Sequence, residues 1–342
     1  MVKVLTYNIH CGIGNDGAYD LARIAGVLRR SGCDIACLQE VEVNLETRKL
    51  RKWSHEHNDN QAELLAKASG LGYFSFAGPL RAYTGEYRRE CFENPFDEVL
   101  IRDTEGKTGY GNAILTRYPI RESRALVFEQ METPRSEEYI FMDREEQPRG
   151  ARAILVDIGA ELDEDKKSAA NKVESSPPPQ CCTASQASKP KEAAIKTPST
   201  LLWIVNAHLS HKLSSTEQRN QSRQLEDWID ALVSEYMQQG EKPGYILCGD
   251  LNAPSFAPLS SYSTFMGDGR WTDTWKEKGT TCNQATFPSS CCGSACGIKV
   301  DHILMLDRKE AAKVQCKAVR VLGAEVDASD HLAVLADLEV SP

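Results

Sequence analysis

The stretch that decides the fold lies at the start of the chain: Val2-Lys3-Val4-Leu5-Thr6-Tyr7-Asn8-Ile9, an amphipathic segment over residues 19–30, and Asp34-Ile35-Ala36-Cys37-Leu38. The first and third segments are short apolar runs, which predicts two β-strands. In the segment between them, apolar residues recur at helical spacing, namely Leu21, Ile24, Val27 and Leu28. A strand, a helix and a second strand in so short a span indicate a layered α/β architecture.

Outward from this unit, strands and helices alternate along the whole chain. We predict helices over residues 60–69 and 216–237. Further strands are predicted over 73–77, 110–115 paired with 124–128, 151–158, 201–207, 245–248, 300–306, 314–322 and 332–338. Several of these strands are too close together for crossover helices, which favours two packed sheets. The expected fold is a single α/β (α+β) domain over residues 1–342, a four-layer α/β/β/α sandwich of two mixed β-sheets flanked by helices.

One segment differs in composition from the rest. Residues from about 160 to 199 are rich in Lys, Ser, Pro and Ala and contain almost no large apolar side chains. Such a composition cannot bury enough apolar surface to offset the entropy of ordering the chain. We therefore predict a disordered, low-complexity insertion between two neighbouring strands.

The overall composition limits the classes of partner. The chain has 41% hydrophobic and 26% charged residues, which is typical of a globular protein with a substantial core. Its 49 acidic and 40 basic residues give a net charge of -9, so no overall positive field attracts nucleic acid, although a local basic rim can coexist with it.

The chain shows neither a signal peptide nor an apolar run of the ~20 residues that a membrane span needs. We therefore expect an intracellular, cytoplasmic protein whose 12 cysteines are mostly thiols. Peripheral contact with lipid and the oligomeric state stay open.

Polar residues follow many of the apolar runs, and strand ends are where a layered fold assembles its site. Any one of them has a simple explanation as a turn or a solvated group. Together they provide four carboxylates, two amides and two imidazoles, which are costly to bury unless they bind something. The set comprises Asn8, Glu40, His208, Asp250, Asn252, Asp301, Asp330 and His331.

The chemistry of this set indicates a metal and a reaction. Carboxylate and amide oxygens are the ligands of Mg²⁺ or Mn²⁺, whereas zinc sites favour histidine and cysteine. Phosphoryl transfer needs such an ion and a group that orients or deprotonates water.

Seven short motifs, in this order along the chain, resemble those of the endonuclease/exonuclease/phosphatase superfamily, which has the deoxyribonuclease-I-like fold. They are Thr6-Tyr7-Asn8-Ile9-His10, Leu38-Gln39-Glu40-Val41, Tyr110-Gly111-Asn112-Ala113, Asn206-Ala207-His208-Leu209, Gly249-Asp250-Leu251-Asn252-Ala253, Asp301-His302-Ile303 and Ser329-Asp330-His331. Within that superfamily the chain is most similar to a broad group of metal-dependent hydrolases that has no single substrate. The resemblance therefore implies a reaction type rather than a physiological role.

The resemblance also implies roles. Three residues would form the metal site for Mg²⁺, with Mn²⁺ as a substitute: Glu40 would ligate the ion with Asn8 beside it, and Asp330 would complete or support the metal shell. Asp250 would align the attacking water, and Asn252 would hold that water or a phosphate oxygen.

Two imidazoles complete the implied catalytic set. His331, oriented by Asp301, would contact the scissile phosphate or act as general base. His208 would stabilise the pentacovalent state or protonate the leaving oxygen. Which histidine is the acid stays open.

Two further residues have competing interpretations. Arg149 resembles the family's phosphate-binding arginine, but an arginine at the rim paired with Glu145 or Glu146 fits the sequence equally well. Asn112 would face substrate or, alternatively, satisfy backbone groups. His211 and Lys212 are candidates to touch the polar end of a substrate.

Four cysteines just before Asp301 raise the question of a structural zinc. Cys282, Cys291, Cys292 and Cys296 lie within fifteen residues, but they do not form two Cys-x-x-Cys knuckles. An irregular loop near the substrate opening is the competing interpretation, and we favour it.

Three hypotheses of function follow. The favoured one is a Mg²⁺-dependent phosphoesterase for a small, lipid-linked or sugar or inositol phosphate. The alternative is a DNA or RNA nuclease with a basic rim from Arg48, Lys49, Arg51, Lys52, Arg81, Arg88 and Arg89. The third is a non-catalytic scaffold of the same fold, which the complete polar set argues against.

Overall fold

The computed structural model describes residues 1–43, 57–83, 86–88, 109–129, 149–159, 199–213, 215–279, 285–290, 297–322 and 327–341. The helices are α1 (Leu21–Ser31), α2 (Gln61–Ser69), α4 (Thr216–Gln238), α5 (Ser261–Met266) and α6 (Thr274–Lys278), with a short 3₁₀ helix η1 (His10–Gly12).

The strands form two sheets. The first sheet has seven strands in the order β12 (Lys313–Leu322), β13 (Ala333–Ser341), β1 (Val2–Asn8), β2 (Ile35–Val43), β5 (Gly109–Thr116), β3 (Tyr73–Tyr83) and β4 (Glu86–Arg88). The second sheet has six strands in the order β10 (Trp271–Asp273), β11 (Asp301–Leu306), β9 (Gly244–Asp250), β8 (Leu201–His208), β7 (Gly150–Asp157) and β6 (Ile120–Val127).

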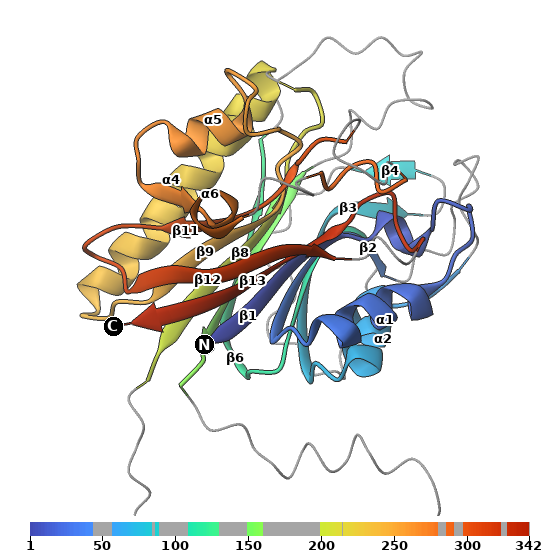
Figure 1. Cartoon of the computed structure of the whole chain (residues 1–342), viewed down its shortest axis with the longest axis horizontal. Helices are drawn as coiled ribbons and strands as arrows, with labels where there is room; N and C mark the ends of the chain where they lie inside the picture. Colours follow the sequence, from blue (N-terminus) through green and yellow to red (C-terminus); the bar gives the residue numbers. More distant parts are fainter. Residues whose placement is uncertain are drawn as a thin grey trace, which may run out of the picture.

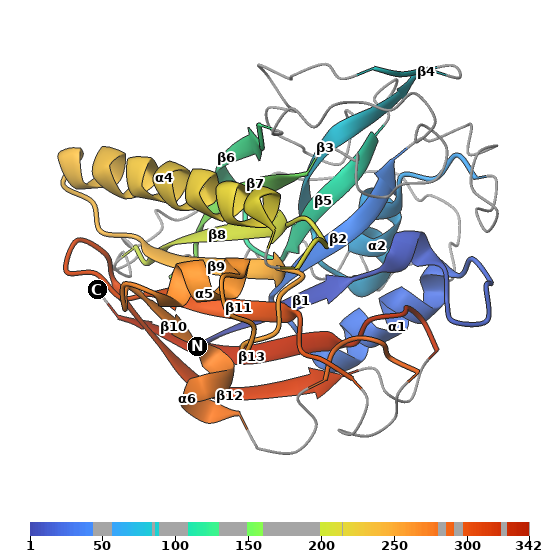
Figure 2. The same cartoon turned by 90° about the horizontal axis from the view of Figure 1, so that it is seen from above.

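The two sheets pack face to face, with helices on their outer faces (Figures 1 and 2). Strand β1 shows how the sequence achieves this, because successive side chains of a strand point to opposite faces. Val2 and Val4 belong to the core between the sheets, whereas Leu5 and Tyr7 pack in the core under α1 and α2. Helices α4 and α5 cover the second sheet in the same way. The predicted four-layer sandwich is confirmed.

The helices begin and end where the sequence places capping residues. Asp20 precedes α1 and accepts a hydrogen bond from the N–H of Ala22, and Gly32 ends the helix with a left-handed φ of 62°. Ser215 caps α4 by accepting from the N–H of Gln218.

The sheets are mixed, and this arrangement brings the polar residues to one edge. Strands β1 and β2 are parallel, as are β8 and β9, so within each pair the carboxyl ends lie together. Strand β11 is antiparallel to β9, and Asp301 at its beginning is opposite Asp250 at the end of β9.

One predicted pairing is wrong. Residues 110–115 and 124–128 were expected to pair with each other, but β5 pairs with β2 and β3, whereas β6 pairs with β7 in the other sheet. The connection between them passes Tyr118, whose side chain is buried in the core between the sheets. The chain therefore changes sheet at this short connection.

Several predictions fall on residues outside the described ranges. These are residues 160–198 of the insertion predicted at about 160–199, the cysteines Cys282, Cys291, Cys292 and Cys296, and the basic residues Arg48, Lys49, Arg51, Lys52 and Arg89. The strands that flank the insertion, β7 and β8, pair antiparallel. The side chains of Arg81 and Arg88 are likewise not described. None of the helices in the described ranges combines the length and apolar character needed to cross a membrane.

Candidate active site

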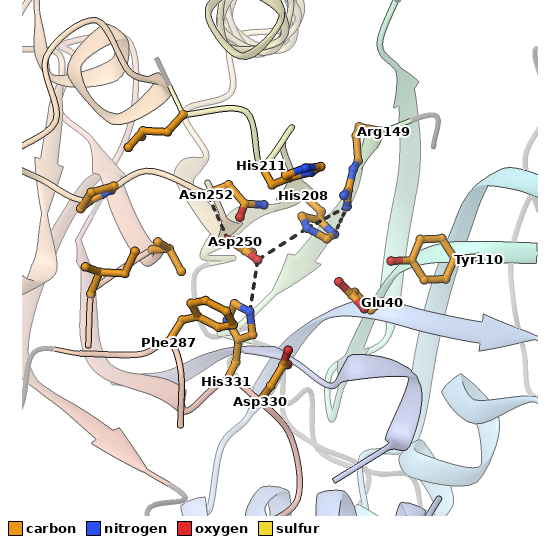
Figure 3. A pocket seen from close by; sticks show the side chains of 14 residues that line it. Glu40, Tyr110, Arg149, His208, His211, Asp250, Asn252, Phe287, Asp330 and His331 are labelled. Carbon is orange, nitrogen blue, oxygen red and sulfur yellow. Dashed lines mark hydrogen bonds and ion pairs between the residues drawn. The ribbon is translucent and has the colours of Figure 1, made fainter. Parts of the chain in front are cut away.

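A cavity of about 330 Å³ lies where the polar edges of the two sheets meet (Figure 3). Seven of the ten predicted site residues line it: Glu40, Arg149, His208, Asp250, Asn252, Asp330 and His331. The other three, Asn8, Asp301 and Asn112, are buried. The structure therefore brings together side chains from both ends of the chain.

Asp250 is at the centre of the contacts. Its Oδ2 lies 3.7 Å from Nε2 of His331, 3.5 Å from Nε2 of His208 and 3.1 Å from Nδ2 of Asn8, which donates to it. Burial and the charge of Asp301 raise the pKa of the Asp250 carboxyl to about 7. The geometry thus gives Asp250 two imidazole neighbours and an unusually high affinity for a proton.

His331 lies between two carboxylates. Its Nδ1 is 2.9 Å from Oδ2 of Asp301, so Asp301 fixes the orientation of the ring. Burial opposes a charge on the imidazole, but the carboxylates of Asp301 and Asp250 outweigh it and raise the pKa of His331 to about 10. The ring is further covered by Phe287, whose centroid lies 4.8 Å away.

His208 has the opposite electrostatic environment. A guanidinium nitrogen of Arg149 is 2.7 Å from each ring nitrogen, and only a neutral ring can accept its proton. Burial and the charge of Arg149 lower the pKa of His208 well below its usual value. Arg149 is itself only 7% exposed, and it lines the cavity. Glu145 and Glu146, its alternative partners at a rim, lie outside the described residues.

The position of Glu40 differs from the expectation. It was predicted at the end of a strand, but β2 continues to Val43, and the pairing of β2 with β5 shifts register between Leu38 and Val41. Glu40 has a φ of 57° in this irregularity. A β-bulge redirects a side chain without ending the strand, which explains how a residue in the middle of β2 reaches the cavity.

A network of buried side-chain amides lies next to the register shift between Leu38 and Val41. Nε2 of Gln39 donates to Oγ1 of Thr6 and to Oδ1 of Asn206, at 3.0 and 2.7 Å. Nδ2 of Asn206 in turn donates to the carbonyls of Leu38 and Ala113, at 2.8 and 2.9 Å. The network ties β2 and β5 of the first sheet to β8 of the second, and so holds the backbone before Glu40.

Asn8 contacts two of the carboxylates that line the cavity. Its Nδ2 donates to Oε1 of Glu40 at 3.3 Å and to Asp250, while its Oδ1 accepts the N–H of His10. In this orientation the amide nitrogen, which cannot ligate a metal, faces the carboxylates.

The turn at the end of β9 positions Asp250 and Asn252. Gly249 has a φ of 148°, and a Cβ there would lie 1.9 Å from the carbonyl oxygen of Ala207, so only glycine fits. Asp250 Oδ1 accepts the N–H of Asn252, and the Asn252 side chain donates to the carbonyl of Leu209.

Asn112 lies in β5 away from the lining of the cavity. Its Nδ2 donates to the carbonyl of Gly150 at 2.8 Å, next to Arg149. Its predicted contact with substrate stays a prediction, and in this structure it links the two sheets beside Arg149.

Six lining residues were not predicted, namely Tyr110, Leu213, Pro254, Phe287, Ile298 and Val300. Tyr110 lies two residues before Asn112, on the same face of β5, so strand periodicity is a signal that points to it. Phe287 lies in a loop with no periodic pattern, and we find no sequence signal for it.

The donor set fits a hard divalent cation. Glu40 and Asp330 both line the cavity, and Figure 3 shows their carboxylates turned into it. One ligand atom from each of Asp250, Asp301 and His331 also lies within 4.8 Å of the others. Ring nitrogens of His331 lie 3.7 Å from Oδ2 of Asp250 and 2.9 Å from Oδ2 of Asp301, so Glu40 and Asp330 are the candidate metal ligands.

Comparison with known proteins shows the family of the chain. The family model described as "Endonuclease/Exonuclease/phosphatase family" matches residues 5–331. No curated protein is significantly similar in sequence.

Three solved structures share the fold. An endonuclease/exonuclease/phosphatase from Beutenbergia cavernae DSM 12333 has a TM-score of 0.62 at 18% identity, covering 99% of this chain and 72% of that one. A mannosyl-6-phosphatase from Bacteroides thetaiotaomicron VPI-5482 has a TM-score of 0.58 at 15% identity, covering 99% and 100%. A humanized D. rerio TDP2 has a TM-score of 0.52 at 15% identity, covering 99% and 98%. Because the family model spans nearly the whole sequence, the chain belongs to the endonuclease/exonuclease/phosphatase family.

Proposed function

We propose that this protein is a Mg²⁺-dependent phosphoesterase that directs a water molecule in line at a phosphate ester. The observation that carries the proposal is the position of Asp250, in contact with His331, His208 and Asn8 in one cavity that also contains Glu40 and Asp330. Phosphate ester hydrolysis is the chemistry of the family to which the chain belongs.

In the proposed mechanism, Glu40 and Asp330 hold the divalent cation. When bound, that cation neutralises charge on the non-bridging oxygens of the phosphate. Asn8 orients the Glu40 carboxylate through its amide hydrogen bond. Mn²⁺ has the same preference for oxygen ligands and is expected to substitute.

Asp250 aligns the attacking water and accepts its proton. The carboxylate is fixed by hydrogen bonds from the N–H of Asn252 and the amide of Asn8, so it is held in one orientation. The side-chain oxygen of Asn252 holds the same water or a phosphate oxygen, since its nitrogen is engaged with Leu209.

The two histidines and Arg149 bind the phosphate. His331 is oriented by Asp301 and contacts the phosphate from the side of Asp330. Arg149 and His208 contact it from the other side, where the guanidinium contributes a planar set of donors. Asn112 supports Arg149 through the carbonyl of Gly150.

Hydrolysis of bis-p-nitrophenyl phosphate tests the proposal. We expect release of p-nitrophenol that EDTA abolishes and Mg²⁺ restores, and a loss of roughly 100-fold or more in kcat for Asp250→Asn. Asp227→Asn, a change of the same type on the exposed face of α4, is the control and keeps full activity. Full turnover by Asp250→Asn, or turnover that is indifferent to EDTA, contradicts the proposal.

The physiological substrate is proposed to be a small, lipid-linked or sugar or inositol phosphate rather than a nucleic acid. The net charge of -9 supports this, since nucleic-acid binding depends on positive charge. Cleavage of oligonucleotides that falls steeply with added salt would favour a nuclease instead.

A further inference from the structure

We infer that the cavity contains a preformed apolar subsite for one alcohol group of the substrate, and that this alcohol carries a hydrocarbon group rather than a ring of hydroxyls. The inference rests on the proposed phosphoesterase activity, and it narrows the substrate class. Five of the side chains that line the cavity contain only carbon, namely Leu213, Pro254, Phe287, Ile298 and Val300. We call these five residues the apolar wall.

The apolar wall adjoins the charged residues at Phe287. In Figure 3 the ring of Phe287 lies against His331, and Arg149, Tyr110 and Glu40 lie on the other side of His331. The two ring centroids of Phe287 and His331 are 4.8 Å apart. A phosphate held by the charged residues therefore has apolar surface beside it in one direction.

The backbone holds the wall in place. Phe287 and Ile298 exchange two hydrogen bonds, from N–H of Ile298 to O of Phe287 at 2.7 Å and in the reverse direction at 3.0 Å. The N–H of Leu332 donates to the carbonyl of Thr286, and the N–H of Ser289 donates to the carbonyl of Asp330. The segment that carries Phe287 is thus tied directly to the loop of Asp330 and His331. A subsite with a fixed position relative to the phosphate loses little entropy on binding.

Part of the wall is exposed to solvent. Leu213 is 48% exposed and Ile298 is 37% exposed, and the lining of the cavity outside the wall is polar or charged. Removing such surface from water is favourable when the group that covers it is also apolar. A hydrocarbon group of a phosphate ester provides that cover.

The same wall is a poor match for a sugar or an inositol. Among the described lining residues, none of the five side chains of the wall has a nitrogen or oxygen that could bond a hydroxyl. Polyol hydroxyls placed against it would lose their hydrogen bonds to water without replacement, which disfavours binding. An alkyl or aryl group has no such loss.

Diesters that share one leaving group test the inference on the full chain. We compare kcat/KM for p-nitrophenyl phosphodiesters whose second alcohol is methyl, octyl, phenyl or inositol. The octyl or the phenyl ester is expected to exceed both the methyl and the inositol ester by roughly tenfold or more. The octyl and phenyl arms distinguish an alkyl from an aromatic source of the hydrocarbon group.

Two variants test whether the preference for the octyl ester depends on the apolar wall. Leu213→Ser and Ile298→Ser are expected to reduce the ratio of octyl to methyl kcat/KM by roughly fivefold each, because each removes apolar surface from the subsite. Leu64→Ser, at a 41% exposed position on α2, is the matched control and leaves both the ratio and the activity unchanged. Equal kcat/KM values for all four esters, or a preference for inositol, overturn the inference, as do variants that keep the ratio of the unmodified chain.

A binding measurement tests the apolar subsite independently of the proposed phosphoesterase activity. Octylphosphonate and methylphosphonate are not hydrolysed, so their dissociation constants by calorimetry do not depend on turnover. Tighter binding of octylphosphonate than of methylphosphonate, by a factor that Leu213→Ser reduces roughly fivefold, supports the subsite. It does so even if no ester is cleaved, in which case the proposed activity alone fails. Equal affinity of the two phosphonates contradicts the subsite whether or not esters are hydrolysed.

Discussion

Oδ2 of Asp301 lies 2.9 Å from Nδ1 of His331, and both side chains are buried. The carboxylate accepts the proton of Nδ1, which directs Nε2 of His331 toward Asp250 and the cavity. Replacing the carboxylate by an amide removes the negative charge that raises the pKa of His331 and orients its ring. We therefore expect Asp301→Asn to lower kcat by roughly 100-fold or more with little change in folding.

The measurement is the rate of phosphodiester hydrolysis together with thermal unfolding. Asp307→Asn, at the exposed residue that follows β11, is the matched control and should behave like the unmodified chain. An Asp301→Asn variant with unchanged kcat would show that the orientation of His331 does not matter for the reaction.

The amide of Asn206 is predicted to hold the irregularity that presents Glu40. Asn206→Leu keeps the approximate size but leaves the buried carbonyls of Leu38 and Ala113 without this donor. The expected cost is about 2–4 kcal/mol in the free energy of unfolding. Denaturation in urea measures it, and Asn220→Leu on α4, whose side chain is half-buried, should change stability by no more than about 0.5 kcal/mol. Equal stability of the two variants would rule out this role for the network.

Lys299 is predicted to be important for stability rather than for binding. Its ammonium is buried and lies 3.1 Å from Oδ2 of Asp273 and 3.1 Å from Nδ1 of His302, whose Nε2 donates to the carbonyl of Ala253. Lys299→Met leaves the Asp273 charge buried without its cation, and we expect a loss of about 3–5 kcal/mol.

The control for that change is Lys317→Met. Lys317 pairs with Glu339 at 2.6 Å, but the two side chains are 42% and 48% exposed, so its loss should cost about 0–1 kcal/mol. Urea denaturation of both variants gives the comparison. Similar losses for the two lysines would contradict the distinction between a buried and an exposed pair.

We predict that Glu226 on α4 makes the free energy of unfolding depend on pH. Burial raises the pKa of its carboxyl to about 7 in the folded chain, from an ordinary value of 4.5. A carboxyl whose folded pKa is raised stabilises the fold most below pH 4.5, and this contribution is lost as the pH rises through 7. Glu226→Gln cannot ionise, so relative to this variant the unmodified chain should lose stability between pH 5 and pH 8. A constant difference across this range contradicts the prediction, and Glu241→Gln, at an exposed position just after α4, is the control.

Much of the fold was predictable because its signals are local. The alternation of Val4, Leu5, Thr6 and Tyr7, and the helical spacing of Leu225, Ile229, Leu232 and Tyr236, depend on neighbours a few residues away. The four-layer sandwich follows from many such segments. The wrong pairing of residues 110–115 with 124–128 shows the limit, because a short connection can either turn a hairpin or cross to the other sheet.

The site was predictable to the extent that its residues follow apolar runs. Asn8, His208 and Asp250 end strands as expected, and the parallel pairs bring them to one edge. Glu40 did not fit that pattern, because an irregularity in strand pairing depends on the partner strand and has no local signal. Phe287 could not be found for a similar reason, since its place beside His331 is set by contacts between distant loops.

The central claim is that the carboxylates of Glu40 and Asp330 hold the divalent cation on which hydrolysis depends. The most direct measurement is the dissociation constant of Mn²⁺, by loss of its free electron paramagnetic resonance signal. It compares the unmodified chain, Glu40→Gln and, as a control on α2, the half-buried Glu63→Gln. We expect the unmodified chain and Glu63→Gln to bind Mn²⁺ alike, and Glu40→Gln to bind it roughly 100-fold more weakly. Equal binding by Glu40→Gln, or no binding by the unmodified chain, would contradict the account.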